Sequence, residues 1–92
     1  MLLETTLSDV QLRALDYLLD RPYSRRSQVG YALYGGGVGA KSNRAREGGV
    51  VLSRLLKAGL VAWELDKNDN QVFFLTVQGH QALKVNRHGF GV

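Results

Sequence analysis

The residues best suited to chemistry in this sequence are the cationic and amide side chains of residues 41–46. Arginine can donate two hydrogen bonds to one guanine, and asparagine can pair in the same way with adenine. Lysine and serine contact phosphates without regard to base sequence. We therefore predict that this stretch contacts duplex DNA, with the base-reading candidates Asn43, Arg44 and Arg46.

Positive charge is unevenly distributed along the sequence. Eight basic residues and one acid lie within residues 21–57, whereas the remainder carries four basic and seven acidic residues. Such a separation indicates one cationic surface that meets a polyanion. Candidates for contacts to the DNA backbone are Ser24, Arg25, Arg26, Lys41, Ser42, Lys67 and Asn68.

The run GGGVGAKS, residues 35–42, is close to the phosphate-binding loop of nucleotide hydrolases, although Ala40 stands in place of its last glycine. That fold requires a strand before the loop, and residues 29–34 have a helical pattern instead. His80 and His88 have no carboxylate or thiol at ligand spacing. We therefore predict no catalytic site, no metal and no cofactor, and hence no enzyme.

The length of 92 residues and the hydrophobic fraction of 45% are those of one globular domain. We expect this domain to span residues 1–85 and a flexible tail to span residues 86–92. The absence of cysteine excludes disulfides and thiolate metal sites. No targeting signal and no apolar run of membrane-spanning length is recognisable, so a cytoplasmic location is expected.

Helix signals divide the first two thirds of the chain into three segments. Ser8 and Gln11 form a capping-box pattern before a leucine-rich helix that should end at Pro22. A second helix should start at Ser24 and bury Val29, Ala32 and Leu33. A third should extend from after Ser42 to about Ala58. The pair Gly48–Gly49 either allows another helix to approach closely or marks the true start of this third helix.

A hairpin is predicted after Gly59, which has the position of a helix C-cap. Two strand-like runs, residues 60–65 and 71–77, flank a turn rich in Asn and Asp. Alternation predicts one face with Leu60, Ala62, Phe73 and Leu75, and a second apolar face with Val61, Trp63, Leu65, Val72 and Phe74. The second face is either covered by the N-terminal segment as a third strand or serves as a dimer or partner face. Thr76 should then cap a last helix that ends near Val85.

The segment VVLSRLLKAGLVAWELDKNDNQVFFLTVQGHQAL, residues 50–83, resembles the recognition helix, wing and following helix of MarR- and PadR-type regulators. The residues that carry the resemblance are Ser53-Arg54-Leu55-Leu56, Gly59-Leu60-Val61, and the Leu-Thr-x-x-Gly motif at residues 75–79. The fold it implies is α+β. It is a small winged helix-turn-helix domain with three helices, a two- or three-stranded antiparallel wing and a short C-terminal helix.

The resemblance implies sequence-directed binding of double-stranded DNA, and with it transcriptional regulation. The third helix would enter the major groove, and Lys67 and Asn68 would reach the adjacent backbone or minor groove. A homodimer is expected. No small-molecule effector is expected, because 92 residues leave no counterpart to the additional helices of full-length MarR proteins. The alternatives are a protein–protein interaction module that uses the Trp63 and Phe74 face, and a DNA-binding accessory factor in replication, recombination or phage functions.

Overall fold

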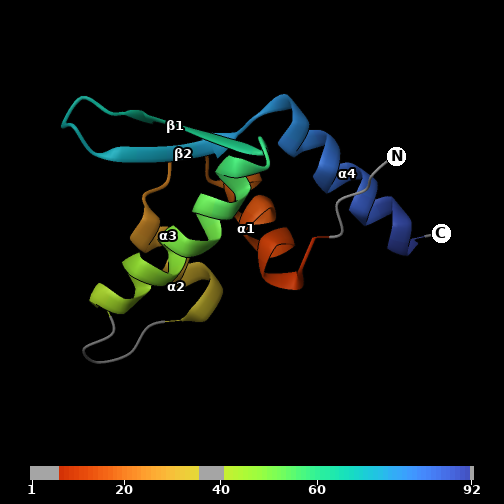
Figure 1. The fold of residues 1–92 in the computed structure, drawn as a ribbon, viewed down its shortest axis with the longest axis horizontal. Helices are drawn as coiled ribbons and strands as arrows, with labels where there is room; N and C mark the ends of the chain where they lie inside the picture. The colour runs from red at the N-terminus through yellow and green to blue at the C-terminus, as the bar shows by residue number, and fades with distance from the viewer. Residues whose placement is uncertain (1–6, 36–40, 92) are drawn as a thin grey trace.

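The computed structural model describes residues 7–35 and 41–91, except for the side chains of residues 41, 42 and 87–91. Three helices lie beneath a two-stranded hairpin, and a fourth helix leaves at the opposite end from the hairpin tip (Figure 1). This architecture confirms the α+β winged helix-turn-helix fold expected from the sequence. The elements in chain order are α1 (Asp9–Asp20), α2 (Arg26–Tyr34), α3 (Lys41–Lys57), β1 (Val61–Leu65), β2 (Gln71–Leu75) and α4 (Val77–Gly91).

The helix α1 begins as its capping residues predict. The Ser8 hydroxyl accepts a hydrogen bond from the Gln11 backbone N–H at 3.2 Å, and the Gln11 side chain accepts one from the Ser8 N–H at 2.9 Å. These bonds satisfy two N–H groups that have no partner inside the helix. The apolar face of α1 packs into a core that includes Ala14, Leu15, Leu18, Leu52, Leu55 and Phe73.

Helices α2 and α3 cross in close backbone contact at two glycines. A Cβ atom on Gly48 would collide with the Arg26 carbonyl oxygen and lie 2.8 Å from the Gly30 nitrogen. A Cβ atom on Gly30 would collide with the Arg44 carbonyl. Because α3 continues without interruption through these glycines, the first of the two explanations is confirmed. Gly30 therefore lies on the buried face of α2, whereas Ala32, which was expected there, is exposed.

The hairpin has a register different from the one that the alternation predicted. Val61 pairs with Leu75, and Trp63 pairs with Phe73, so these four side chains share one face of the sheet. The predicted apolar face is thereby split: Val61, Trp63 and Leu65 lie on one side, and Val72 and Phe74 lie on the other. Both strands are apolar on both sides, so alternation alone does not set their register.

The two strands of the hairpin differ in burial, since β2 is mostly buried whereas β1 is buried only at its first residue. Val61 and Val72 are buried, whereas Trp63 is 47% and Leu65 is 56% exposed. The base of the hairpin covers the core, and the rest extends past α2 (Figure 1). The five residues expected to form one partner face are thus distributed over two faces and two environments.

A short segment before α2 pairs with the free edge of β2. The Tyr23 N–H donates to the Phe73 carbonyl at 2.8 Å, and the Phe73 N–H donates to the Ser24 carbonyl at 2.8 Å. The ring of Tyr23 lies against Phe74, with centroids 5.3 Å apart. The segment that pairs with the edge of β2 thus lies between α1 and α2, and the expected third strand from the N-terminal segment is not seen in residues 7–35.

Ser24 does not cap α2 as predicted. The helix begins at Arg26, and the Gln28 side chain accepts the Arg25 backbone N–H at 2.8 Å. The pairing of Ser24 with Phe73 holds it in the sheet, and its hydroxyl donates to the Arg21 carbonyl at 2.6 Å. A tertiary contact has displaced the local preference of serine for a helix N-cap.

The helix α4 is capped by Thr76, as expected. Its hydroxyl accepts the Gly79 N–H at 3.0 Å and donates to the Gly59 carbonyl at 2.7 Å. Gly79 is needed in this turn because a Cβ atom there would collide with the Leu60 carbonyl. The helix is longer than predicted, since its backbone continues through Gly91 rather than ending near Val85. Within the described residues, no helix is both long and apolar enough to cross a membrane.

Candidate nucleic-acid interface

The helix α3 has one polar face that points away from the core. Successive residues rotate about 100° around a helix axis, so residues three, four, seven, eight and eleven apart share a face. The residues on this face are all exposed, and they fall within an arc of about 100°. They are Asn43, Arg46, Val50, Ser53, Arg54 and Lys57.

An open groove of about 630 Å³ lies between this face of α3, the start of α2 and the strand β2. Its floor is apolar and includes Leu52, Leu56 and Phe73, and four cations and no acid line it. A second hollow of about 180 Å³ joins Arg25 and Arg26 to Asn70 and Gln71, where the turn of the hairpin leads into β2. The cations of the main groove are Arg26, Arg46, Arg54 and Lys57.

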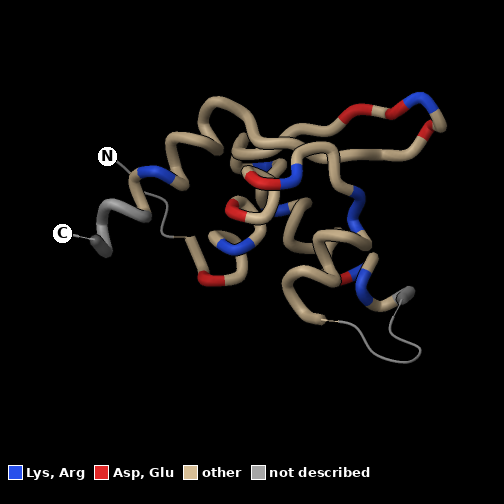
Figure 2. Tube along the Cα trace, turned by 180° about the vertical axis from the view of Figure 1, so that it is seen from behind, with Lys and Arg blue, Asp and Glu red and all other residues tan. Residues whose placement is uncertain are grey.

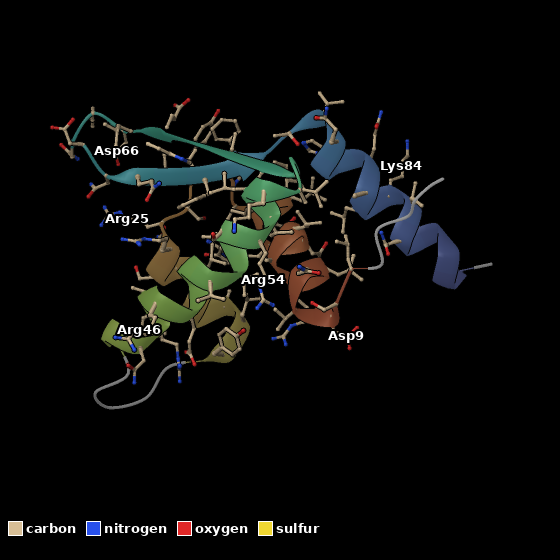
Figure 3. All side chains as sticks on the ribbon, viewed as in Figure 1. Asp9, Arg25, Arg46, Arg54, Asp66 and Lys84 are labelled. Carbon is tan, nitrogen blue, oxygen red and sulfur yellow. The ribbon has the colours of Figure 1, made fainter. Side chains whose placement is uncertain are left out.

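The distribution of charge in space agrees with this grouping. Arg25 and Arg46 lie below the hairpin at one end of the molecule, Arg54 lies further along α3, and Lys84 lies at the opposite end on α4 (Figure 3). In the trace, one blue segment lies just below the hairpin and another lies near the start of α3 (Figure 2). Five cations from α3 and the start of α2 therefore form one surface, which we call the cationic surface: Arg25, Arg26, Arg46, Arg54 and Lys57.

From the sequence, Arg54 and Lys57 were weaker candidates than Asn43, Arg44 and Arg46, yet both line the groove. Their spacing contained the signal, since Arg46, Val50, Arg54 and Lys57 follow one another at intervals of four, four and three residues. Gln71 also lines the groove, but no pattern in the sequence predicts this, because the position of Gln71 depends on where β2 packs against α3.

Arg44, predicted to read bases, is engaged inside the protein. Its Nε donates to the Gly35 carbonyl, and its Nη1 forms an ion pair with Glu47. The side chain is only 19% exposed, because Arg44 is in helical phase with Gly48 and Leu55 on the face that meets α2. Asn43 and Arg46, the other two predicted readers, are exposed.

The predicted backbone contacts have mixed placements. Arg25 and Arg26 are exposed at the start of α2. Ser24 is only 4% exposed with its hydroxyl bonded inward, so it is not displayed to a ligand. Lys41 and Ser42 open α3, and their side chains lie outside the described residues.

The hairpin tip displays Lys67 and Asn68 on a turn organised by Asp66. The Asp66 carboxylate accepts the backbone N–H of Asn70 at 2.9 Å and that of Asn68 at 2.8 Å. The bond from the Asn70 backbone is the main cause that lowers the pKa of Asp66. In the sequence, Lys67 lies between Asp66 and Asp69 of this turn, and both Lys67 and Asp69 are exposed.

Other chemistry is not supported within residues 7–35 and 41–91. No group of three or more His, Asp or Glu side chains is arranged to hold a metal ion among the described residues. His80 is exposed, and the side chain of His88 lies outside the described part. The cationic surface is therefore the site with the clearest chemical character.

The packing of α3 across α2, followed by a hairpin, defines a winged helix-turn-helix domain. No protein-family model matches the sequence, and no curated protein matches it. Solved structures do match it, and the winged-helix resemblance drawn from the sequence is thereby confirmed. They include MarR-family transcriptional regulators.

Three of these structures illustrate the likeness. A mutant of MepR from S. aureus bound to an oligodeoxyribonucleotide has 17% identity and a TM-score of 0.74, and the match covers 91% of this chain and 58% of that one. PcaV from Streptomyces coelicolor, solved with its natural ligand, has 24% identity and a TM-score of 0.65, with coverage of 85% and 51%. A MarR-family regulator from Silicibacter pomeroyi has 23% identity and a TM-score of 0.61, with coverage of 94% and 60%.

The chain spans little more than half the length of the solved structures that head the comparison. At these identities the likeness establishes the fold. The activity of this domain must therefore be argued from its own residues.

Proposed function

We propose that this domain binds double-stranded DNA through the cationic surface. The observation that carries the proposal is the groove between α3 and β2, which four cations and no acid line. Phosphates attract such a surface and release bound counterions when they meet it. The likeness to MepR, solved with an oligodeoxyribonucleotide, supports the same conclusion.

The exposed face of α3 would enter the major groove, which admits an α-helix. Asn43 and Arg46 are the base-reading candidates that remain displayed on this face. Arg54 and Lys57 lie further along the same face and would contact phosphate or base edges. Arg44 takes a positioning role, because its contacts to Gly35 and Glu47 link the end of α2 to the start of α3.

The start of α2 would hold the DNA backbone. Arg25 and Arg26 occupy the N-terminal end of the helix, where backbone N–H groups are free and the dipole favours anions. The cationic side chains and the helix terminus thus attract the same phosphate. Lys41 and Ser42 remain candidates for a similar contact at the start of α3.

The biological role that best fits DNA binding is transcriptional regulation, since the solved neighbours are described as transcriptional regulators. We further propose a homodimer, whose operator would contain two related half-sites. The prediction that no small-molecule effector binds remains untested, and PcaV was solved with a natural ligand. A protein-interaction module is less well supported, because its expected apolar face is split between two sides of the hairpin.

The test is a titration of fluorescently labelled duplex DNA with the full chain at several salt concentrations. If about five phosphates are neutralised, a plot of the logarithm of the binding constant against the logarithm of the salt concentration should have a slope of about −4.5. Absence of binding to any duplex at low salt would overturn the proposal. The same titration with single-stranded DNA and with RNA duplex would show whether B-form duplex is preferred.

A matched pair of variants tests whether the cationic surface is the contact. Arg46→Ala should weaken binding by about 1–3 kcal/mol on a specific site. Lys84→Ala removes an exposed cation at the far end of the molecule and should leave binding unchanged. Equal losses from the two variants would mean that binding follows net charge rather than this surface.

A further inference from the structure

One apolar side chain lies in the middle of the polar face of α3. Val50 is 50% exposed and lines the groove together with Arg46, Ser53 and Arg54. Every other side chain that α3 exposes on this face is an arginine, a lysine, an asparagine or a serine. The position of Val50 among hydrogen-bonding groups therefore requires a separate explanation.

Packing within the domain does not provide that explanation. The neighbouring Val51, Leu52 and Leu55 are 5% exposed or less and carry the core contacts of α3. A β-branched residue also lowers helix stability relative to alanine or lysine at an exposed position. Single exposed apolar residues are common in proteins, but this one lies at the centre of the candidate reading face.

We propose that Val50 contacts the 5-methyl group of a thymine in the major groove. Thymine is the only standard base that presents a methyl group there, and small apolar side chains recognise it by contact. The inference rests on the proposed DNA binding and adds a specificity-determining residue to it. Burial of two apolar groups against each other favours thymine over cytosine and uracil at that position.

The spacing along α3 places this thymine relative to the base that Arg46 reads. Four residues of helix advance about 6 Å along the axis, because each residue rises 1.5 Å. Base pairs in duplex DNA are about 3.4 Å apart. A thymine read by Val50 should therefore lie within about two base pairs of a guanine read by Arg46.

The experiment uses the full chain and a binding site selected from a random duplex pool. Each thymine of that site is replaced in turn by deoxyuridine, which removes only the methyl group. Replacement at one position should weaken binding about threefold to fivefold, the value of one buried methyl group. Replacement at the other positions should change affinity little.

Variants at residue 50 assign the effect to this side chain. Val50→Ser has no γ-methyl group and should bind thymine and deoxyuridine sites equally, whereas Val50→Thr keeps one γ-methyl group and should retain the discrimination. Ser53→Ala is the matched control, since it alters the same face and should leave the discrimination intact. Because residues 50 and 53 are exposed, all these variants should remain folded, with a free energy of unfolding within about 0.5 kcal/mol of wild type, which circular dichroism would verify.

The outcomes separate this inference from the proposed function. Salt-dependent duplex binding that shows no sensitivity to deoxyuridine at any position overturns the role of Val50 and leaves DNA binding in place. Discrimination that persists in Val50→Ser overturns it as well. Failure to bind any duplex at low salt overturns both.

Discussion

Gly48 on α3 lies directly against the Arg26 carbonyl on α2, so that a side chain at position 48 would have no space. This contact sets the distance between the two helices that build the cationic surface. We expect Gly48→Ala to destabilise the domain by about 1–3 kcal/mol, the usual cost of overpacking. It should also weaken DNA binding, because α2 and its arginines would move relative to α3.

Gly49 offers the matched control for this prediction. A Cβ atom there would meet only the Arg26 side chain, with Cδ at 3.3 Å. Alanine has a higher helix propensity than glycine by about 1 kcal/mol, so Gly49→Ala should leave the domain as stable or make it more stable. Denaturant unfolding of both variants measures the difference. A similar loss from both would contradict the close-crossing explanation.

Arg44 and Arg46 should behave as opposites although they are two residues apart. Arg44→Ala removes the contacts to Gly35 and Glu47 and should cost about 1–2 kcal/mol of unfolding free energy. Its effect on DNA binding should be the same for specific and random sequences. Arg46→Ala should leave stability within about 0.5 kcal/mol of wild type and weaken specific binding preferentially.

Thermal unfolding and DNA titration of the two variants provide the comparison. If Arg44→Ala loses sequence discrimination without losing stability, then Arg44 swings out to read bases and the contacts seen here break in the complex. Glu47→Gln is a useful second variant, because it weakens the ion pair while it leaves the Arg44 side chain in place.

Features decided by local chemistry were predictable from the sequence. The capping box at Ser8, the glycine at the end of α3 and the cap at Thr76 all occur as expected. Gly59 adopts φ of 78°, and the Leu60 N–H donates to the Leu55 carbonyl at 2.9 Å, as in a Schellman motif. Such motifs depend on residues a few positions apart, so a short window contains the necessary information.

Features decided by distant contacts were not predictable in the same way. The register of the hairpin was ambiguous because apolar residues occupy both sides of both strands, and the five-residue turn from Asp66 to Asn70 determined it instead. Ser24 joins β2 through Phe73, which no local pattern signals. The inward orientation of Arg44 could have been predicted, since Arg44 is in helical phase with Gly48 and Leu55. It was missed because the expected interface grouped basic residues that are neighbours in the sequence, whichever face of the helix they occupy.

The pH dependence of the hairpin turn should follow the Asp66 carboxyl. Backbone N–H bonds, that of Asn70 first, lower the pKa of Asp66 in the folded state below its usual 3.8. The stabilisation of the turn is therefore complete above the usual value and is lost as the pH falls through the lower folded value. We expect the amide protons of Asn68 and Asn70 to lose exchange protection over that acid range.

An NMR titration of the carboxyl resonance and the two amides measures this dependence. Asp66→Ala should remove both the titration and the protection at neutral pH, while α1 remains folded. A carboxyl of Asp66 that titrates at or above its usual value would contradict the hydrogen bonding described here.

Charge at the hairpin tip should set how strongly the wing contributes to DNA binding. Lys67 is flanked by Asp66 and Asp69, so its attraction for phosphate is opposed by two nearby carboxylates. Lys67→Ala should weaken binding and reduce the magnitude of the salt slope by about one. Asp69→Asn should strengthen binding, and it preserves the fold because asparagine also tolerates the φ of 63° at this position. Titration of one duplex with both variants tests the contact. If neither variant changes the affinity, then the tip that carries Lys67 and Asn68 does not approach the DNA backbone. Binding would then depend on α2 and α3 alone.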